Sequence, residues 1–394
     1  MRPELPRAID GVLGRALAKE PTRRFETAGE LVSVARSALG LVETAPAPTS
    51  TRRLAIPAAV ALAVAAVALG FLFMRDSGGG SLSSVSPNAV GVIDPSSNEL
   101  VDEVAVGIDP ESIAVGAGGV WVANVEDETV SRIDPATREL ERGGIAVGDY
   151  ASDVTVGAGT VWVALGALAE LSRINPEQNK AASAIPALGA GVPCGAPRAS
   201  VTIGGGAVWF ACEAADLGRI DTRTSTARRV GLEAGILTSP NAVLPNFSDI
   251  VYGLERLWIV NRAANAVIEI DTTTIQRQRD ITVGNAPSAI AVSADSLWVT
   301  NFEDDTVTRV AISAPGQTPT LTTIPVGDGP VDVAFGEGGV WVVSQLDRAV
   351  TRIDPESGDV KATIGIGNEA QRVAAGEGAV WVTVRAPETE AEDG

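Results

Sequence analysis

Residues 112–148, SIAVGAGGVWVANVEDETVSRIDPATRELERGGIAVG, contain the pattern from which the fold of this chain can be predicted. It divides into four short runs of strand-forming residues, at 112–115, 120–123, 129–133 and 140–147. A Gly-rich turn separates the first two runs and an Asp-Pro turn separates the last two. A 3.6-residue helical periodicity is absent. The pattern therefore predicts four consecutive antiparallel strands.

Tryptophan marks a repeat of this unit along the chain. All seven Trp occupy the same position of the repeat, at Trp121, Trp162, Trp209, Trp258, Trp298, Trp341 and Trp381. Their spacings run from 40 to 49 residues, a period typical of propellers and solenoids. Because four antiparallel strands make one propeller blade, the repeat predicts an all-β propeller.

The two ends of the array are incomplete in complementary ways. Residues 89–107 contain the third and fourth strands of a unit without a Trp strand, and residues 372–384 contain only the first and second strands. Together they make one blade, which closes the ring and hides strand edges. The expectation is a seven-bladed β-propeller over residues 87–386 with a split closing blade. The alternative, an open solenoid, would call for polar capping repeats.

Three segments carry a resemblance to a known family of repeats. GVWVANVEDETVSRIDP (119–135), SLWVTNFEDDTVTRV (296–310) and GVWVVSQLDRAVTRIDP (339–355) resemble the YVTN-type β-propeller repeats of bacterial surface and periplasmic proteins. Trp stands where that family often carries Tyr. The resemblance extends over residues 87–386 and implies the fold, whereas propellers in general host many unrelated functions.

Residues 54–74, LAIPAAVALAVAAVALGFLFM, are twenty-one residues without a charge. At ~1.5 Å per residue a helix of this length spans a ~30 Å hydrocarbon layer. The alternatives are a buried helix or a signal peptide, although a signal peptide would begin near the start of the chain. Arg52 and Arg53 precede the segment, while Arg75 beyond it is balanced by Asp76. The positive-inside bias predicts a single-pass cell-membrane protein with a cytoplasmic N-terminus and an extracytoplasmic propeller.

The segment LPRAIDGVLGRALAKEPTRRFETAGELVSVARSAL, residues 5–39, resembles the last two helices of a bacterial serine/threonine protein kinase domain. Pro21 to Phe25 match the P-x-x-R-F/Y signature of that family, which implies that Arg24 is its structural arginine. A generic amphipathic helix pair is the alternative. The catalytic elements of a kinase would lie upstream, so we expect no phosphoryl transfer by this chain itself. The expected organisation is a two-helix kinase remnant at 1–41, a juxtamembrane linker at 42–53, the membrane helix at 54–74, a Gly/Ser stalk at 75–86, the propeller, and an acidic tail at 387–394.

Composition excludes several functions of the large domain. Residues 77–394 hold 20 basic and 42 acidic residues, a balance of −22, which argues against nucleic-acid binding. The chain has no His, the commonest general base and zinc ligand. Streptogramin (virginiamycin) B lyases are similar seven-bladed propellers in which a His acts with bound Mg²⁺, so the missing His disfavours a lyase. We expect no cofactor, no metal site and no catalytic residue.

Candidate binding residues lie in loops between the second and third strands. These loops carry two acidic clusters, Glu126, Asp127 and Glu128 in blade 1 and Glu303, Asp304 and Asp305 in blade 5. The clusters are interpreted either as solvated loops or as a rim for a cation or polar ligand.

Two long insertions, 185–198 and 232–248, connect fourth strands to the next blade and should emerge on the same face as the acidic loops. Cys194 lies in the first insertion and Cys212 ends a strand at that face, so a disulfide is predicted. Two reduced thiols are the alternative.

These observations favour an extracytoplasmic sensor that binds an unknown ligand or protein and is tethered to a cytoplasmic kinase. The resemblance to receptor kinases implies a homodimer. A surface scaffold or adhesion protein without signalling is the second interpretation, and a lyase-type enzyme is the third.

Overall fold

The structure is a computed structural model that describes residues 81–148, 150–189, 192–194, 198–213, 216–231, 246–312 and 318–387. The chain divides into two compact units, Met1–Arg75 and Asp76–Gly394. The kinase-like segment with Arg24, the linker, the segment 54–74 and the acidic tail beyond residue 387 lie outside the described residues. Among the residues that are described, no helix has the length and hydropathy that crossing a membrane requires.

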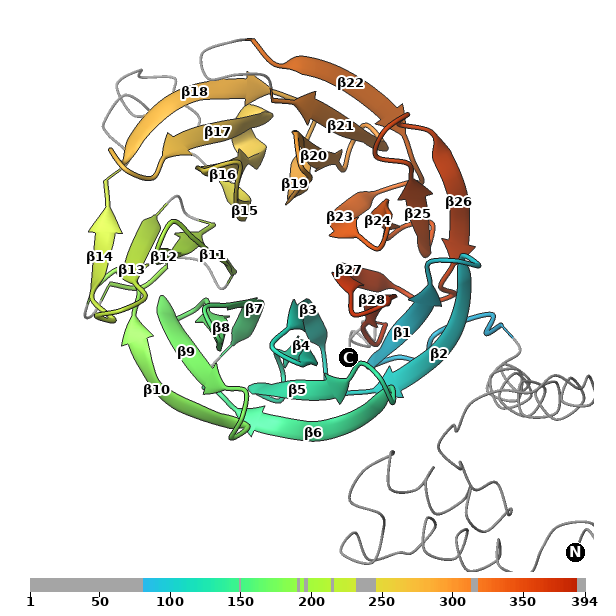
Figure 1. Cartoon of the computed structure of the whole chain (residues 1–394), viewed down its shortest axis with the longest axis horizontal. Helices are drawn as coiled ribbons and strands as arrows, with labels where there is room; N and C mark the ends of the chain where they lie inside the picture. Colours follow the sequence, from blue (N-terminus) through green and yellow to red (C-terminus); the bar gives the residue numbers. More distant parts are fainter. Residues whose placement is uncertain are drawn as a thin grey trace, which may run out of the picture. The chain divides into compact units, whose positions relative to one another are not determined.

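The second unit is a seven-bladed β-propeller in which each blade is a four-stranded antiparallel sheet (Figure 1). Blade 1 contains β3 (Pro110–Gly116), β4 (Gly119–Asn124), β5 (Thr129–Asp134) and β6 (Glu139–Ala146). Blade 2 contains β7 (Ala151–Gly157), β8 (Thr160–Leu165), β9 (Glu170–Asn175) and β10 (Lys180–Pro186). Blade 3 contains β11 (Ala199–Gly204), β12 (Ala207–Cys212), β13 (Leu217–Asp221) and β14 (Ala227–Val230).

The remaining blades repeat this order. Blade 4 contains β15 (Phe247–Gly253), β16 (Arg256–Asn261), β17 (Ala266–Asp271) and β18 (Gln276–Thr282). Blade 5 contains β19 (Pro287–Val292), β20 (Ser296–Asn301), β21 (Thr306–Ala311) and β22 (Thr320–Pro325). Blade 6 contains β23 (Pro330–Gly336), β24 (Gly339–Ser344), β25 (Ala349–Ile353) and β26 (Val360–Gly365). Each strand of blade 1 begins and ends within two residues of its predicted position.

The closing blade is split between the two ends of the array, as predicted. It combines β27 (Ala370–Gly376) and β28 (Ala379–Val384) with β1 (Ala89–Asp94) and β2 (Glu99–Ala105). Strand β1 pairs antiparallel with β28, from Ala89 opposite Val384 to Ile93 opposite Val380. In Figure 1 the blue first strands accordingly lie beside the red last ones. The ring is thereby sealed by backbone hydrogen bonds between distant parts of the chain.

The second strand of each blade forms the core. Six of the seven Trp side chains are fully buried and Trp162 is nearly so. They lie between blades: Trp121, for example, packs against Val154 and Val161 of blade 2. Because each indole buries a large apolar area, one Trp per blade gives the ring repeated apolar contacts between neighbouring sheets.

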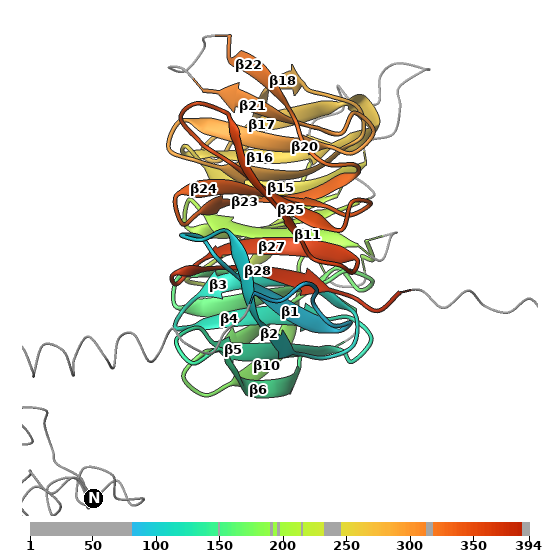
Figure 2. The ribbon, with the colours of Figure 1, turned by 90° about the vertical axis from the view of Figure 1, so that its right-hand side faces the viewer.

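Strands run between the two faces of the ring, as the edge-on view shows (Figure 2). Each inner strand starts at the face that carries the 2–3 loops, such as 125–128, and the 4–1 connections, such as 187–198. We call this the insertion face. On the opposite face, Asp134 and Asp354 fix the 3–4 turns, because each Oδ1 accepts two backbone N–H groups of its own turn.

Candidate functional site

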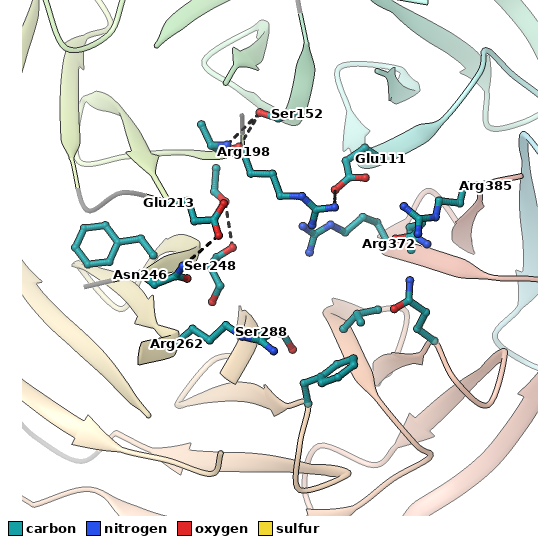
Figure 3. Close-up of a pocket in the computed structure, with 17 residues that line it drawn as sticks. Glu111, Ser152, Arg198, Glu213, Asn246, Ser248, Arg262, Ser288, Arg372 and Arg385 are labelled. Carbon is teal, nitrogen blue, oxygen red and sulfur yellow. Dashed lines mark hydrogen bonds and ion pairs between the residues drawn. The ribbon is translucent and has the colours of Figure 1, made fainter. Parts of the chain in front are cut away.

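A cavity of about 470 Å³ lies on the insertion face at the ring centre, where the inner strands begin (Figure 3). Its volume falls within the ~300–1,000 Å³ of typical small-molecule sites. Its lining consists of inner-strand residues together with residues from the 2–3 loops, the 4–1 connections and the segment after β28. These are Glu111, Ser152, Arg198, Ala199, Ser200, Glu213, Asn246, Phe247, Ser248, Arg262, Ser288, Phe302, Val331, Gln345, Gln371, Arg372 and Arg385.

Serines at the second residue of four inner strands join neighbouring blades. Each hydroxyl donates to a backbone carbonyl of the next blade, from Ser152 to Ala199 (2.9 Å), Ser200 to Ser248 (3.4 Å), Ser248 to Pro287 (3.0 Å) and Ser288 to Pro330 (2.7 Å). Their protons are therefore committed to the fold. The same position is Glu111 in blade 1, Val331 in blade 6 and Gln371 in blade 7. The serine pattern is thus interrupted on one side of the cavity.

One residue further along, three inner strands carry aspartates. Each carboxylate accepts a backbone N–H of the next blade, from Val201 to Asp153 (2.7 Å), Ile290 to Asp249 (2.9 Å) and Val373 to Asp332 (2.7 Å). Burial raises the pKa of Asp249 to about 7 and that of Asp332 to about 6, and it also raises the pKa of Asp153. These side chains act as clamps between blades, and they carry negative charge at pH values above their raised pKa values.

Arg372, from β27, is the cation that faces this charge. Its guanidinium lies 3.4 Å from Asp332, and the side chain is 24% exposed. Burial acts to lower the pKa of Arg372, but the charges of Asp332, Glu111, Asp249 and Asp153 outweigh it and raise the pKa above its usual value. Arg372 is therefore a permanent cation at the centre of the ring.

Three further arginines line the cavity. Arg198 pairs with Glu111 at 3.2 Å, and Arg385 pairs with Glu369 at 2.9 Å. Arg262 differs, because its guanidinium has no hydrogen bond or ion pair within the described part of the chain and lies over the ring of Phe302, 5.4 Å from its centroid. Figure 3 shows Arg198 and Arg372 extending into the pocket from opposite sides, with Arg262 below them.

The first insertion is held by the disulfide that the sequence predicts. Cys194 and Cys212 are bonded with an S–S distance of 2.00 Å, and both are buried. The bridge ties the connection 187–198 to the end of β12, and Arg198 follows at the end of that connection. Most of the second insertion, residues 232–245, lies outside the described residues, while Asn246 and Ser248 reach the cavity lining.

The six acidic loop residues that the sequence put forward do not line this cavity. Asp127 accepts the backbone N–H of Ile108 (2.7 Å), Asp304 accepts that of Asn285 (2.7 Å), and Asp305 accepts that of Gly329 (2.9 Å). These three carboxylates therefore tie 4–1 connections to 2–3 loops.

The other three acidic residues, Glu126, Glu128 and Glu303, are exposed on those loops. Glu126 lines a separate depression with Asp109 and Arg385. Within the described residues, no group of three or more acidic, His or Cys side chains is arranged to hold a metal ion.

The cavity residues themselves were not predicted from sequence. A signal was available, since the polar pairs at residues 111–112, 152–153, 248–249 and 371–372 all fall at the start of a first strand. An alignment of the units by their Trp would have placed these pairs together at the ring centre.

Comparisons with known proteins define the class but not the family. No protein-family model and no curated protein matches this chain. Similar solved structures include a streptogramin B lyase, with a TM-score of 0.56 and 16% identity over 75% of this chain and 94% of that chain. The Cps50 (Swd1) β-propeller domain of Myceliophteria thermophila has a TM-score of 0.57 and 11% identity over 71% and 98%.

Apo AztD from Citrobacter koseri has a TM-score of 0.55 and 12% identity over 76% of this chain and 99% of that chain. At these identities the likeness is one of fold alone. The class is that of the seven-bladed β-propellers, in which fold does not decide function.

Proposed function

We propose that the propeller is the extracytoplasmic ligand-binding domain of a membrane-anchored sensor. The observation that carries this proposal is the cavity of about 470 Å³ at the ring centre, lined by arginine, glutamine, asparagine and two phenylalanine side chains. A concave site with convergent polar groups is the usual form of a small-molecule binding site. The cavity opens on the face that carries the disulfide-bonded insertion, and loops of this kind commonly hold binding residues.

Two observations support a location outside the cytoplasm. The Cys194–Cys212 bridge suits an oxidising compartment, because thiols in the cytosol are kept reduced. The charge difference across residues 54–74, with Arg52 and Arg53 before them, favours an N-terminus inside the cell. The membrane is therefore the first partner that we propose for the chain.

In this proposal, the propeller is coupled through the membrane segment to a cytoplasmic serine/threonine kinase domain. The support is the resemblance of residues 5–39, including Arg24, to the end of a bacterial kinase domain. In this proposal, a ligand bound at the insertion face changes the association of two anchors in a homodimer, and the change reaches the kinase. The gene sequence upstream of Met1 tests this step: an in-frame kinase core supports it, and an in-frame stop codon contradicts it.

Two alternatives use the same fold. A surface scaffold would need no ligand in the central cavity. Partner binding that is unaffected by substitutions in the cavity lining would therefore favour the scaffold. A lyase would need a general base and bound metal, and the fold likeness to a streptogramin B lyase carries no residue correspondence at 16% identity. Metal-dependent turnover that is lost on substitution of Glu126 or Asp304 would favour the lyase.

Topology in a bacterial host tests the location. Alkaline phosphatase fused after Gly394 of the full chain should be active, because this enzyme folds only in an oxidising compartment. The matched control is the same fusion without residues 54–74, which should be inactive at equal protein level. An inactive full-length fusion would contradict the proposed orientation.

A further inference from the structure

We infer that the central cavity binds a small organic anion whose carboxylate or phosphate group is held by the guanidinium of Arg262. This inference rests on the proposed binding function and adds the chemical class of the ligand. Its starting point is the contrast in charge between the cavity and the domain. Residues 77–394 carry a balance of −22, whereas the cavity lining contains four arginines and two glutamates.

Most of this positive charge is matched by nearby carboxylates. Arg198 pairs with Glu111, Arg385 with Glu369, and Arg372 with Asp332. A ligand could contact these cations only by sharing them with the carboxylates that already neutralise them. The three ion pairs therefore make the cavity wall polar, but they do not by themselves form a strong binding site for an anion.

Arg262 is the exception among the described residues, since its guanidinium has neither a hydrogen bond nor an ion pair with any of them. It follows β16 in a short 3₁₀ turn, η3 (Arg262–Ala264). Its backbone N–H donates to the carbonyl of Asn246 at 2.8 Å, which fixes the start of the side chain. The ring of Phe302, from the next blade, fixes its far end by a cation–π contact of 5.4 Å.

This arrangement prepares the group for an anion. A guanidinium presents its N–H donors in a planar fork that matches carboxylate and phosphate oxygens in two parallel hydrogen bonds. Because both ends of the side chain are already held, little conformational freedom is lost when the ligand binds. A cation in a concave site of an acidic domain also concentrates anions locally, where the rest of the surface repels them.

The other free groups of the cavity suit the remainder of such a ligand. The Nε2 groups of Gln345 and Gln371 both donate to Glu369, at 2.8 and 3.2 Å, which leaves their Oε1 atoms as acceptors. Ligand hydroxyl or amine groups can donate to these oxygens. Phe302 and Val331 supply apolar surface. The ligand class is therefore a small polar acid such as a sugar acid or an amino acid.

Matched pairs of probes test the inference with the full chain in detergent. Glucuronate is compared with glucose and succinate with succinamide, since the neutral member of each pair has no carboxylate. Inorganic phosphate separates a requirement for phosphate from one for a carboxylate. Binding is measured by titration calorimetry and by the rise in melting temperature at constant ionic strength.

We expect at least one anion to bind while its neutral counterpart does not, and R262Q to weaken that binding by ~10-fold or more. R262K should restore part of the affinity, because it keeps the charge and loses the planar fork. The matched control is R223Q, which removes the same charge from an exposed 3–4 turn on the opposite face and should leave the affinity unchanged.

Three outcomes would overturn the inference. If R262Q binds the anion as well as the unsubstituted chain and has the same ligand-free melting temperature, the anion is held elsewhere. If glucose or succinamide binds as tightly as its acid, the anion requirement is wrong while the proposed binding function stands. If no probe of either charge binds, the ligand class is wrong, and the phosphatase fusion separately decides the proposed location.

Discussion

At the residue scale, a Trp–Arg pair recurs through the ring. In five blades an arginine of the third strand places its guanidinium over the Trp of the second strand, at 4.9 to 5.7 Å from the ring centroid. Arg132 also donates to the carbonyl of Pro176 and to Asn179 Oδ1, both 2.8 Å away in the next blade. The short sequence R-I-D-P therefore encodes a joint between blades as well as a turn.

The pair is replaced in the other two blades. In blade 4, Glu269 lies opposite Trp258 and forms ion pairs with Arg256 (3.4 Å) and Arg279 (2.6 Å). In blade 7, Val92 lies opposite Trp381. Blade 4 therefore retains charged contacts of another kind, whereas blade 7 depends on apolar packing at this position.

Asp249 makes stability depend on pH in a direction that can be worked out. Burial raises its folded-state pKa from 3.8 to about 7, so the folded protein binds this proton more tightly than the unfolded chain does. The contribution is fully present below the unfolded pKa and is lost as pH rises through the folded pKa. Asp332, with a pKa of about 6, acts in the same direction. We expect stability to fall as pH rises from about 5 to 8, and D249N to reduce this fall.

Urea unfolding midpoints at pH 5, 6, 7 and 8 measure the effect. The control is D328N, which removes an exposed carboxylate on the insertion face and should keep the original slope. A D249N variant with an unchanged pH dependence would show that Asp249 is ionised in the folded protein at all these values. Below about pH 4 the turn aspartates Asp134 and Asp354 oppose the trend, because backbone hydrogen bonds lower their pKa and stabilise their ionised forms.

At the element scale, the connection between β10 and β11 joins the fold to the cavity. Its start is fixed by the backbone bond from Ala187 N–H to the carbonyl of Ala169 (2.7 Å) and by buried Leu188. Its middle is fixed by the disulfide at Cys194, and its end supplies Arg198. A 4–1 connection of this length would otherwise have few contacts to hold it.

Breaking the disulfide should therefore loosen this element. The bridge spans a sequence separation of 18, for which loop-closure entropy predicts a stabilisation of about 3 kcal/mol. We expect a reducing agent to lower the urea midpoint of the chain by a corresponding amount. The double variant C194A/C212A is the control, because its midpoint should already be low and should not respond to the reductant. If the reductant left the original chain unchanged, the bridge would contribute nothing to stability.

At the scale of the whole molecule, the ring depends on closure by distant segments. Besides the pairing of β1 with β28, the backbone N–H of Val85 donates to the carbonyl of Ile366 at 2.9 Å, and Val85 is fully buried. An open array would expose the edge of β28 and the apolar face that β1 and β2 cover. Closure therefore stabilises every blade indirectly, since it removes both ends of the array.

Deletion of residues 89–107 tests this directly. The truncated chain should lose the soluble monomer and its cooperative thermal transition, as size-exclusion chromatography and calorimetry would show. The control is removal of residues 1–75, which belong to the other compact unit and should leave the transition of the propeller in place. A monomeric, soluble deletion product with unchanged heat resistance would contradict the closed ring.

Much of the fold could be predicted from sequence because its determinants are local or periodic. Strand alternation, the turns at Asp134 and Asp354 and the Trp spacing each lie within one repeat, and the two half-units at the ends indicate the split blade. The Cys194–Cys212 pair was predicted because strand direction puts both residues on the insertion face and an extracytoplasmic location favours a disulfide. Strand alternation and turns depend on neighbouring residues, and the repeat depends on regular spacing along the chain. Both kinds of pattern are visible in the sequence without knowledge of the tertiary structure.

The cavity was decided only by tertiary structure. Its lining takes one to four residues from each blade, at positions some 40 residues apart, and no single repeat contains a recognisable site. Packing also decided which carboxylates are buried: Asp249 and Asp332 lie on inner strands, whereas the more conspicuous Asp127 and Asp304 bind loop backbone at the surface. The order of residues along the chain was sufficient to predict the blades and their closure. The charge, burial and unpaired hydrogen-bonding groups of the ring centre arise only when seven strand ends converge, because the desolvation of each group depends on all of these strand ends together.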